Sequence, residues 1–182
     1  MSEKIIITFP DGNKKEVDKG INGLELASQI SKSLAKESVA IKINNEIKDI
    51  SLPINSDASV AILKRDSEET LELIRHDCAH VMAEAVQELF PETQVTIGPA
   101  IENGFYYDFA RDEPFTLADL PKIEKKMHEI IQRNKNFVRE VWSKEKSIKH
   151  FKDKGENYKV ELINDLPDSE EISIYKQGDW LD

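Results

Sequence analysis

The chain has 182 residues, of which 39% are hydrophobic and 33% are charged, and its formal net charge is −10. No run approaches the roughly 18 apolar residues that a membrane-spanning helix needs, and residues 1–12 lack the apolar core of a signal peptide. A single cysteine, Cys78, excludes an internal disulfide. These features predict a globular protein of the reducing cytoplasm, with no membrane partner.

The first third of the chain has the pattern of a small β-rich domain. Asp11-Gly12 is a strong hairpin signal between two short runs that each predict a strand. Residues 22–38 predict one helix, with Asn22 as its cap, Glu25 in its first turn, and Leu24 and Ile30 among its apolar positions. The remaining runs predict further strands. The order indicates a β-grasp domain over residues 1–64, in which one mixed sheet covers one helix. The expected strands are residues 4–9, 14–20, 39–44, 47–50 and 58–63.

A longer helix is expected from residues 66 or 67 to about residue 89, before Pro91. At 100° per residue, an apolar stripe centres on Cys78, whereas His76 and His80 lie about 160° and 200° away from it. The two histidines therefore share the face opposite the expected core. They either face solvent or line a cleft between this helix and a sheet. A pair at this spacing can bind a metal or hold a substrate and a water. Cys78 points toward the core and is a poor ligand candidate.

The rest of the chain alternates short strands and helices. A hairpin is expected around Asn103-Gly104, and Tyr106 and Tyr107 should point to opposite faces of it. A helix over 116–134, a strand over 136–143 and a helix over 143–155 follow. Two further segments, 157–166 and 171–182, complete an α+β domain over residues 65–182, with the long helix packed on an antiparallel sheet.

Residues 122–159 form a basic run in an otherwise acidic region, with 12 Lys or Arg against 6 Asp or Glu. Such a run can contact phosphates, or it can be a solvated helical face. If it binds tRNA, the lysines expected to contact phosphates are Lys122, Lys125 and Lys126.

Five motifs, in this order, resemble bacterial-type threonyl-tRNA synthetases. They are RHDCAH, IGPAIENGFYYDF, KIEKKMHEII, GENYKVELI and GDWLD. The resemblance covers nearly the whole chain. It implies that residues 1–64 are a TGS domain and that residues 65–182 are the editing domain, which hydrolyses mischarged Ser-tRNA(Thr).

The resemblance also implies roles for particular residues. His76, His80 and Lys159 would be catalytic, whereas Tyr107 and Asp182 would bind the seryl ester of the terminal adenosine. No metal is expected in this chain. By the same resemblance, the parent synthetase would attach threonine to tRNA(Thr) with ATP and Mg, carry a zinc in its catalytic domain, and be a homodimer through domains outside these residues.

The family has a Cys-x-x-x-His motif just after the position of Asp182, and the sequence ends before it. We therefore expect an excised monomeric fragment with reduced or no editing activity. Three alternatives are compatible with the residues alone: a non-enzymatic RNA-binding module, a metal-dependent hydrolase that uses His76 and His80, and a structural TGS-containing adaptor.

Overall fold

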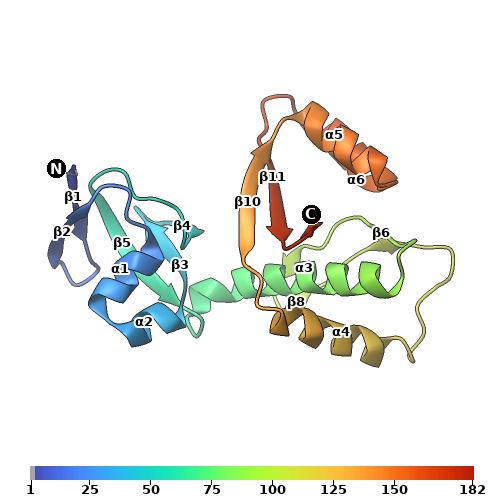
Figure 1. Ribbon diagram of the computed structural model, residues 1–182, viewed down its shortest axis with the longest axis horizontal. Helices are drawn as coiled ribbons and strands as arrows, with labels where there is room; N and C mark the ends of the chain where they lie inside the picture. The colour runs from blue at the N-terminus through green and yellow to red at the C-terminus, as the bar shows by residue number, and fades with distance from the viewer. Residues whose placement is uncertain (1–2) are drawn as a thin grey trace. The chain divides into compact units, whose positions relative to one another are not determined.

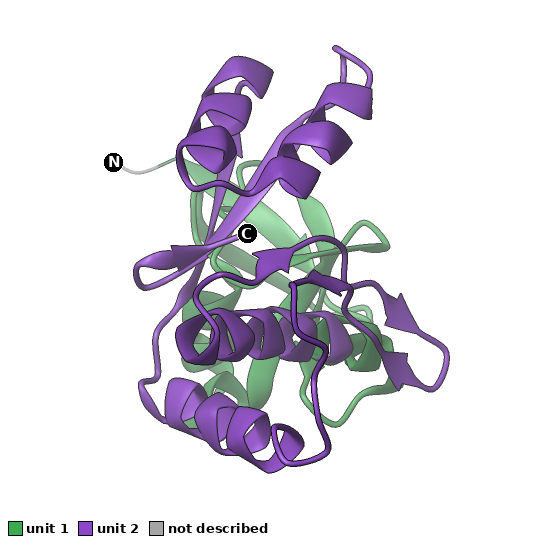
Figure 2. Ribbon diagram, turned by 90° about the vertical axis from the view of Figure 1, so that its right-hand side faces the viewer, with its two compact units in different colours: residues 1–74 green, residues 75–182 purple. Residues whose placement is uncertain are grey.

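The computed structural model describes residues 3–182 and divides into two compact units, residues 1–74 and 75–182 (Figures 1 and 2). The prediction of an α+β chain that begins with a β-grasp domain is confirmed. The division lies inside a helix rather than at the expected boundary after residue 64. None of the helices within residues 3–182 is both long and apolar enough to cross a bilayer.

Unit 1 is a five-stranded mixed sheet in the order β2-β1-β5-β3-β4, with β1 and β5 parallel. Alternate residues of β1, such as Ile5 and Ile7, are buried against Leu26 of the helical layer. This alternation is that of a strand with one face on the core. The strands are β1 (Lys4–Thr8), β2 (Lys14–Asp18), β3 (Ser38–Ile43), β4 (Glu46–Asp49) and β5 (Ala58–Lys64).

The prediction of a single helix in unit 1 is wrong. Two helices occur, α1 (Gly23–Ile30) and α2 (Lys32–Glu37). Ser31 has extended backbone angles, and its side chain caps α2 by accepting a hydrogen bond from the Leu34 N–H. The capping box of Asn22 and Glu25 is confirmed. Leu24 and Ile30 are exposed, so the expected apolar face was misplaced.

Unit 2 is built around α3 (Leu71–Leu89), which follows a 3-10 turn, η1 (Glu68–Thr70). One side of α3 packs on α4 (Leu120–Gln132) through Val81, Ala85, Ile123 and Ile130. Leu71, expected in the buried stripe, is exposed, and Cys78 is only half-buried. Ala79, His80 and Ala83 are also buried, so α3 is packed against other elements on more than one side.

The second core of unit 2 lies between the sheet β10-β11-β12 and a pair of helices (Figure 1). Trp142, Ile172 and Ile174 of the sheet pack against Phe151 and Ile163 of the helices. The expected helix over 116–134 begins only at Leu120, because Thr116 instead forms a turn with Asp119. The elements are β10 (Phe137–Trp142), α5 (Lys144–Asp153), α6 (Asn157–Asp165), β11 (Ile172–Gln177) and β12 (Trp180–Leu181).

The expected hairpin around Asn103-Gly104 is confirmed as β7 (Ala100–Ile101) paired with β8 (Gly104–Phe105). Outside it, β6 (Gln94–Val95) pairs with β9 (Phe109–Ala110). Tyr106 is exposed and Tyr107 lines a cavity, so the two point to different sides, as expected, although both lie in the extended segment between β8 and β9 rather than in a strand.

Candidate functional site

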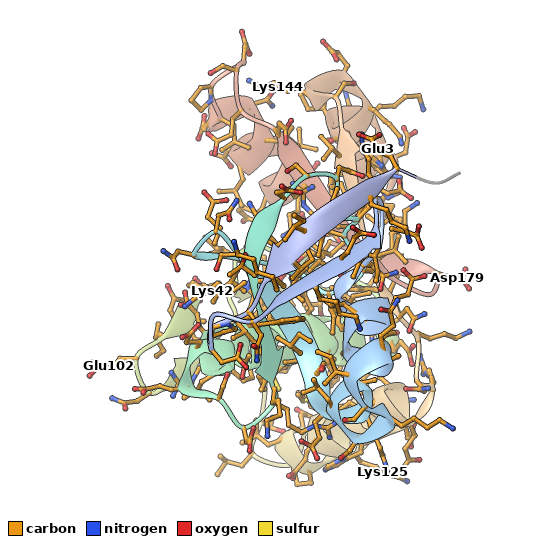
Figure 3. The ribbon with its side chains drawn as sticks, turned by 90° about the vertical axis from the view of Figure 1, so that its left-hand side faces the viewer. Glu3, Lys42, Glu102, Lys125, Lys144 and Asp179 are labelled. Atoms are coloured by element: carbon orange, nitrogen blue, oxygen red, sulfur yellow. The ribbon has the colours of Figure 1, made fainter. Side chains whose placement is uncertain are left out.

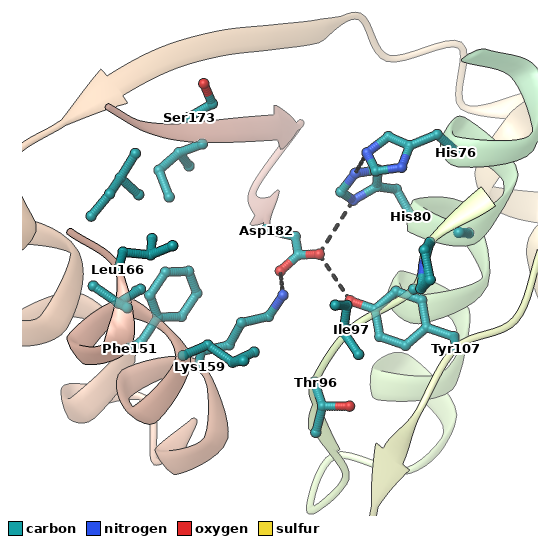
Figure 4. Close-up of a pocket in the computed structure, with 17 residues that line it drawn as sticks. His76, His80, Thr96, Ile97, Tyr107, Phe151, Lys159, Leu166, Ser173 and Asp182 are labelled. Atoms are coloured by element: carbon teal, nitrogen blue, oxygen red, sulfur yellow. Dashed lines mark hydrogen bonds and ion pairs between the residues drawn. The ribbon is translucent and has the colours of Figure 1, made fainter. Parts of the chain in front are cut away.

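A cavity of about 480 Å³ lies in unit 2 between α3, the loop 96–99, α6 and β11 (Figure 4). The face of α3 that carries His76 and His80 opens onto it, so the expected cleft between the long helix and the sheet is confirmed. Five side chains singled out in the sequence line it: His76, His80, Tyr107, Lys159 and Asp182.

Asp182 is the centre of the polar end of this cavity. Its side chain is only 7% exposed. One carboxylate oxygen forms an ion pair with the Lys159 ammonium. The other accepts a hydrogen bond of 2.9 Å from the Tyr107 hydroxyl and lies 3.4 Å from His80 Nδ1. Backbone hydrogen bonds in both directions with Tyr175 hold Asp182 at the end of the sheet.

These contacts keep the Asp182 carboxylate charged. Burial by itself opposes ionisation, but the His80 contact and the positive charge of Lys159 outweigh it and hold the pKa of Asp182 well below its usual range. In contrast, burial, followed by the nearby Asp182 charge, raises the pKa of Tyr107 well above its usual range. Tyr107 is therefore a neutral hydrogen-bond donor at physiological pH.

The two histidines form a hydrogen-bonded pair. Their Nε2 atoms are 3.0 Å apart, and their rings meet edge to face. If His80 directs Nδ1–H toward the Asp182 carboxylate, its neutral form has a lone pair at Nε2, and His76 donates Nε2–H to it. In this arrangement the N–H groups point from the exposed His76 through His80 toward the buried Asp182 carboxylate, which only accepts.

Three aromatic side chains of the sheet β10-β11-β12 pack around the ring of His80 and hold it in place. The ring centroids of Phe137, Tyr175 and Trp180 lie 6.3, 6.1 and 5.9 Å from that of His80. These packing contacts explain why a histidine on the face opposite the predicted core is 7% exposed.

The opposite end of the cavity is apolar. Its walls come from α5, the α6 region and β11, and Ser173 is the polar residue among them. The sequence did not indicate this surface. Its apolar members are Phe151, Leu162, Ile163, Leu166, Ile172 and Ile174.

Gly98 explains how Tyr107 reaches Asp182. A Cβ atom at Gly98 would lie 2.1 Å from Tyr107 Cδ2, so the ring packs directly on the glycine backbone. We predict that Gly98→Ala displaces the ring and lowers the free energy of unfolding by about 1–3 kcal/mol, as overpacking does. Urea denaturation measures it. In a Tyr107→Leu background, the same alanine should cost much less; an equal cost in both backgrounds would contradict the assigned contact.

The predicted tRNA-contacting lysines lie on α4 and do not line the cavity. Lys122 pairs with Asp119 at 3.0 Å, and Lys126 pairs with Glu129 at 2.8 Å and with Glu88 at 3.6 Å. Among residues 3–182, Lys125 has no ion-pair partner within 4 Å, and it projects from the surface (Figure 3). Its charge acts only at longer range on Glu129.

The basic run over 122–159 does not form one continuous surface. Its lysines on α4 and those on α5, including Lys144, lie on opposite sides of unit 2 (Figures 1 and 3). This separation arises because β10 carries the chain from one side of the unit to the other.

No group of three or more His, Cys, Asp or Glu side chains that could hold a metal ion occurs within residues 3–182. The histidine pair instead uses its facing nitrogens for each other and for Asp182.

Comparison with known proteins adds two findings. The TGS domain family matches residues 5–64. The whole chain is 59% identical to the threonine--tRNA ligases of Bartonella quintana (strain Toulouse) and Brucella suis biovar 1, and 60% identical to that of Bartonella bacilliformis. In each case it spans 28% of the relative's length. The similarity to threonyl-tRNA synthetases expected from the motifs is confirmed over the full 182 residues.

Proposed function

We propose that this chain is a region of a threonine--tRNA ligase and that residues 65–182 form a domain that hydrolyses Ser-tRNA(Thr). The whole enzyme would attach threonine to tRNA(Thr) with ATP and Mg. The observation that carries the proposal is the meeting of Lys159, Tyr107 and His80 on the buried carboxylate of Asp182 at the wall of one cavity. Together with whole-chain similarity to these ligases, it supports an editing site.

The need for such a site follows from the chemistry of the substrates. Serine lacks one methyl group of threonine, and a group of that size contributes only about 1–3 kcal/mol of discrimination in a binding pocket. A ligase therefore attaches serine to tRNA(Thr) at a low but appreciable frequency. A second, hydrolytic site removes the serine before it reaches the ribosome.

The proposed reaction is the hydrolysis of an ester. Water attacks the carbonyl carbon of the seryl ester, and the negative charge that develops on its oxygen is offset by the Lys159 ammonium. The bond between that carbon and the ribose oxygen then breaks, and a proton from the attacking water is transferred to the ribose oxygen. The products are serine and uncharged tRNA. The His76 and His80 pair can accept and pass this proton.

Asp182 would have two roles. Its carboxylate holds Lys159 and Tyr107 in place, and it would attract the positively charged amino group of the seryl ester. Among residues 3–182, Oδ1 of Asp182 contacts only Lys159, so an incoming amino group could bind the same oxygen and share its negative charge with that ammonium. Binding of the substrate would thereby release part of the Lys159 charge toward the ester.

The direct test is the rate at which the ligase that contains this chain, with the family's Cys-x-x-x-His motif in place, deacylates Ser-tRNA(Thr) and Thr-tRNA(Thr). We expect faster loss of serine than of threonine. Equal loss of both would contradict the proposed specificity. Tight tRNA binding without any hydrolysis would favour the RNA-binding module.

For the complex with tRNA, we predict that Lys125→Ala weakens binding and lowers the slope of log affinity against log salt concentration by about one, as the loss of one phosphate contact requires. Lys14→Ala, at an exposed position of strand β2 in unit 1, is the matched control. Filter binding at several salt concentrations measures both. An unchanged slope for Lys125→Ala would assign this lysine to the solvated surface.

A further inference from the structure

A buried carboxylate outside the cavity, that of Glu156, lies at the junction of the elements that carry the candidate site. Glu156 is 8% exposed and immediately precedes α6, the helix that contains Lys159. One of its oxygens accepts a hydrogen bond from the Gln87 amide, and the other accepts one of 3.1 Å from the Val95 N–H. It therefore joins α6 to both α3 and β6.

The Gln87 amide extends this network to the end of the chain that carries Asp182. Its oxygen accepts a hydrogen bond of 2.8 Å from the indole N–H of Trp180, two residues before Asp182. Its nitrogen donates to Glu156 and, at 3.2 Å, to the Thr93 carbonyl. Gln87 lies seven residues after His80, or about two helical turns, on the same face of α3.

The chemistry of the donors fixes the direction of every bond in this network. An indole N–H can only donate, so Gln87 must direct its oxygen to Trp180 and its nitrogen to Glu156. Because the other partner of Glu156 is the Val95 N–H, both carboxylate oxygens must accept. Glu156 is thus required as a charged acceptor, although burial raises its pKa above the ordinary value against the opposing effect of these hydrogen bonds.

We propose that Glu156, acting through Gln87, is a positioning residue that holds Lys159 and Asp182 in register with the histidines of α3. The network reaches each of the three elements that carry or adjoin the site residues. Glu156 connects it to the start of α6, Gln87 to α3, and Trp180 to β12. A second contact, from the Asn157 N–H to the Gln94 side chain at 2.8 Å, supports the same junction. The consequence for hydrolysis rests on the proposed function, whereas the connection itself does not.

The test exchanges the two partners. Glu156→Gln keeps the size of the side chain, but its amide N–H₂ must face the N–H donor of either Gln87 or Val95, so one hydrogen bond is lost. Gln87→Glu places two carboxylates against each other. In the double variant, the amide at position 156 again has suitable partners. It donates to the carboxylate at position 87 and accepts a hydrogen bond from the Val95 N–H. That carboxylate in turn accepts from Trp180. Only the bond to the Thr93 carbonyl is lost, so we expect partial recovery.

Two readouts are measured, the first of them on this chain. The first is the indole N–H resonance of Trp180 in a nitrogen-15 NMR spectrum, with Trp142 as an internal control, because its indole donates to Glu140 at 2.6 Å outside the network. The second is the rate of Ser-tRNA(Thr) deacylation by the ligase that contains this chain and the Cys-x-x-x-His motif, with the same substitutions. We expect each single variant to move the Trp180 resonance and slow hydrolysis at least 10-fold, and the double variant to recover part of both while Trp142 stays unchanged.

An unmoved Trp180 resonance in Glu156→Gln, or a double variant no closer to wild type than either single variant, would overturn the proposal. An unchanged rate with a moved resonance would equally refute the positioning role. If the wild-type ligase that contains this chain and the Cys-x-x-x-His motif does not hydrolyse the ester, the proposed function fails, and the resonances still decide whether the network connects β12 to Glu156.

Discussion

Asp182→Asn should lower the free energy of unfolding by about 3 kcal/mol, because removing one partner of a buried ion pair leaves the other charge uncompensated. The substitution keeps the shape of the side chain and removes the charge that Lys159, 16% exposed, is paired with. Urea denaturation at neutral pH measures the loss. The matched control is Asp179→Asn, the same chemical change at an exposed residue three positions earlier, which should cost less than about 0.5 kcal/mol.

The pH dependence of the same variant tests the cause. The pKa of Asp182 is depressed in the folded protein, so its stabilising contribution is present above the unfolded pKa of about 3.9 and is lost as the pH falls toward the folded value. The difference in stability between wild type and Asp182→Asn should therefore be constant above about pH 5 and shrink below it. A difference that stays constant to about pH 3, below the unfolded pKa, would show that the ion pair is not responsible.

Lys159→Ala should reduce the deacylation of Ser-tRNA(Thr) by about 10²–10³-fold, the usual effect of removing one group that stabilises an oxyanion. The ion pair with Asp182 favours a role for the positive charge rather than for a free amine. Lys159→Arg keeps a positive charge that cannot act as a base, so it should retain substantial activity. Rates of serine release under single-turnover conditions measure both variants.

An arginine variant as inactive as the alanine variant would favour a role for lysine as a base. Full activity of Lys159→Ala would remove this residue from the reaction altogether. Lys154→Ala, an exposed lysine before α6, is the control for a nonspecific effect of lost charge on tRNA binding. Near-ultraviolet circular dichroism of each variant distinguishes a loss of chemistry from a loss of fold.

Local patterns were sufficient for the strands of unit 1 and for the shared face of His76 and His80 on α3, but not for the burial of that face or the exposure of Leu71. Alternating burial defines β1, and the spacing of His76 and His80 placed both on one side of α3. The break at Ser31 was missed because the apolar spacing continues across it, and only the capping preference of serine signalled a new start. The pairs from Asp119 to Lys122 and from Lys126 to Glu129 have a helical spacing that the sequence already contained.

The long-range part of the site could not be derived from local patterns. Asp182 meets His80 across more than half of the chain, and only the pairing of β11 with β12 and the bonds to Tyr175 bring it there. Similarity to a known family indicated Asp182 and Lys159 as functional residues, but not their ion pair. Glu156 and Gln87 were missed, although Gln87 shares the histidine face of α3.

The most direct measurement is the binding of a non-hydrolysable seryl-adenosine analogue, with an amide in place of the ester, to the labelled protein. It tests the site without requiring turnover. We expect saturable NMR shift changes at Tyr107, Lys159 and Asp182 and in the imidazoles of His76 and His80, with the threonyl analogue binding more weakly. Saturable changes confined to residues outside the cavity, or none at millimolar analogue, would contradict the assignment of this cavity as an editing site.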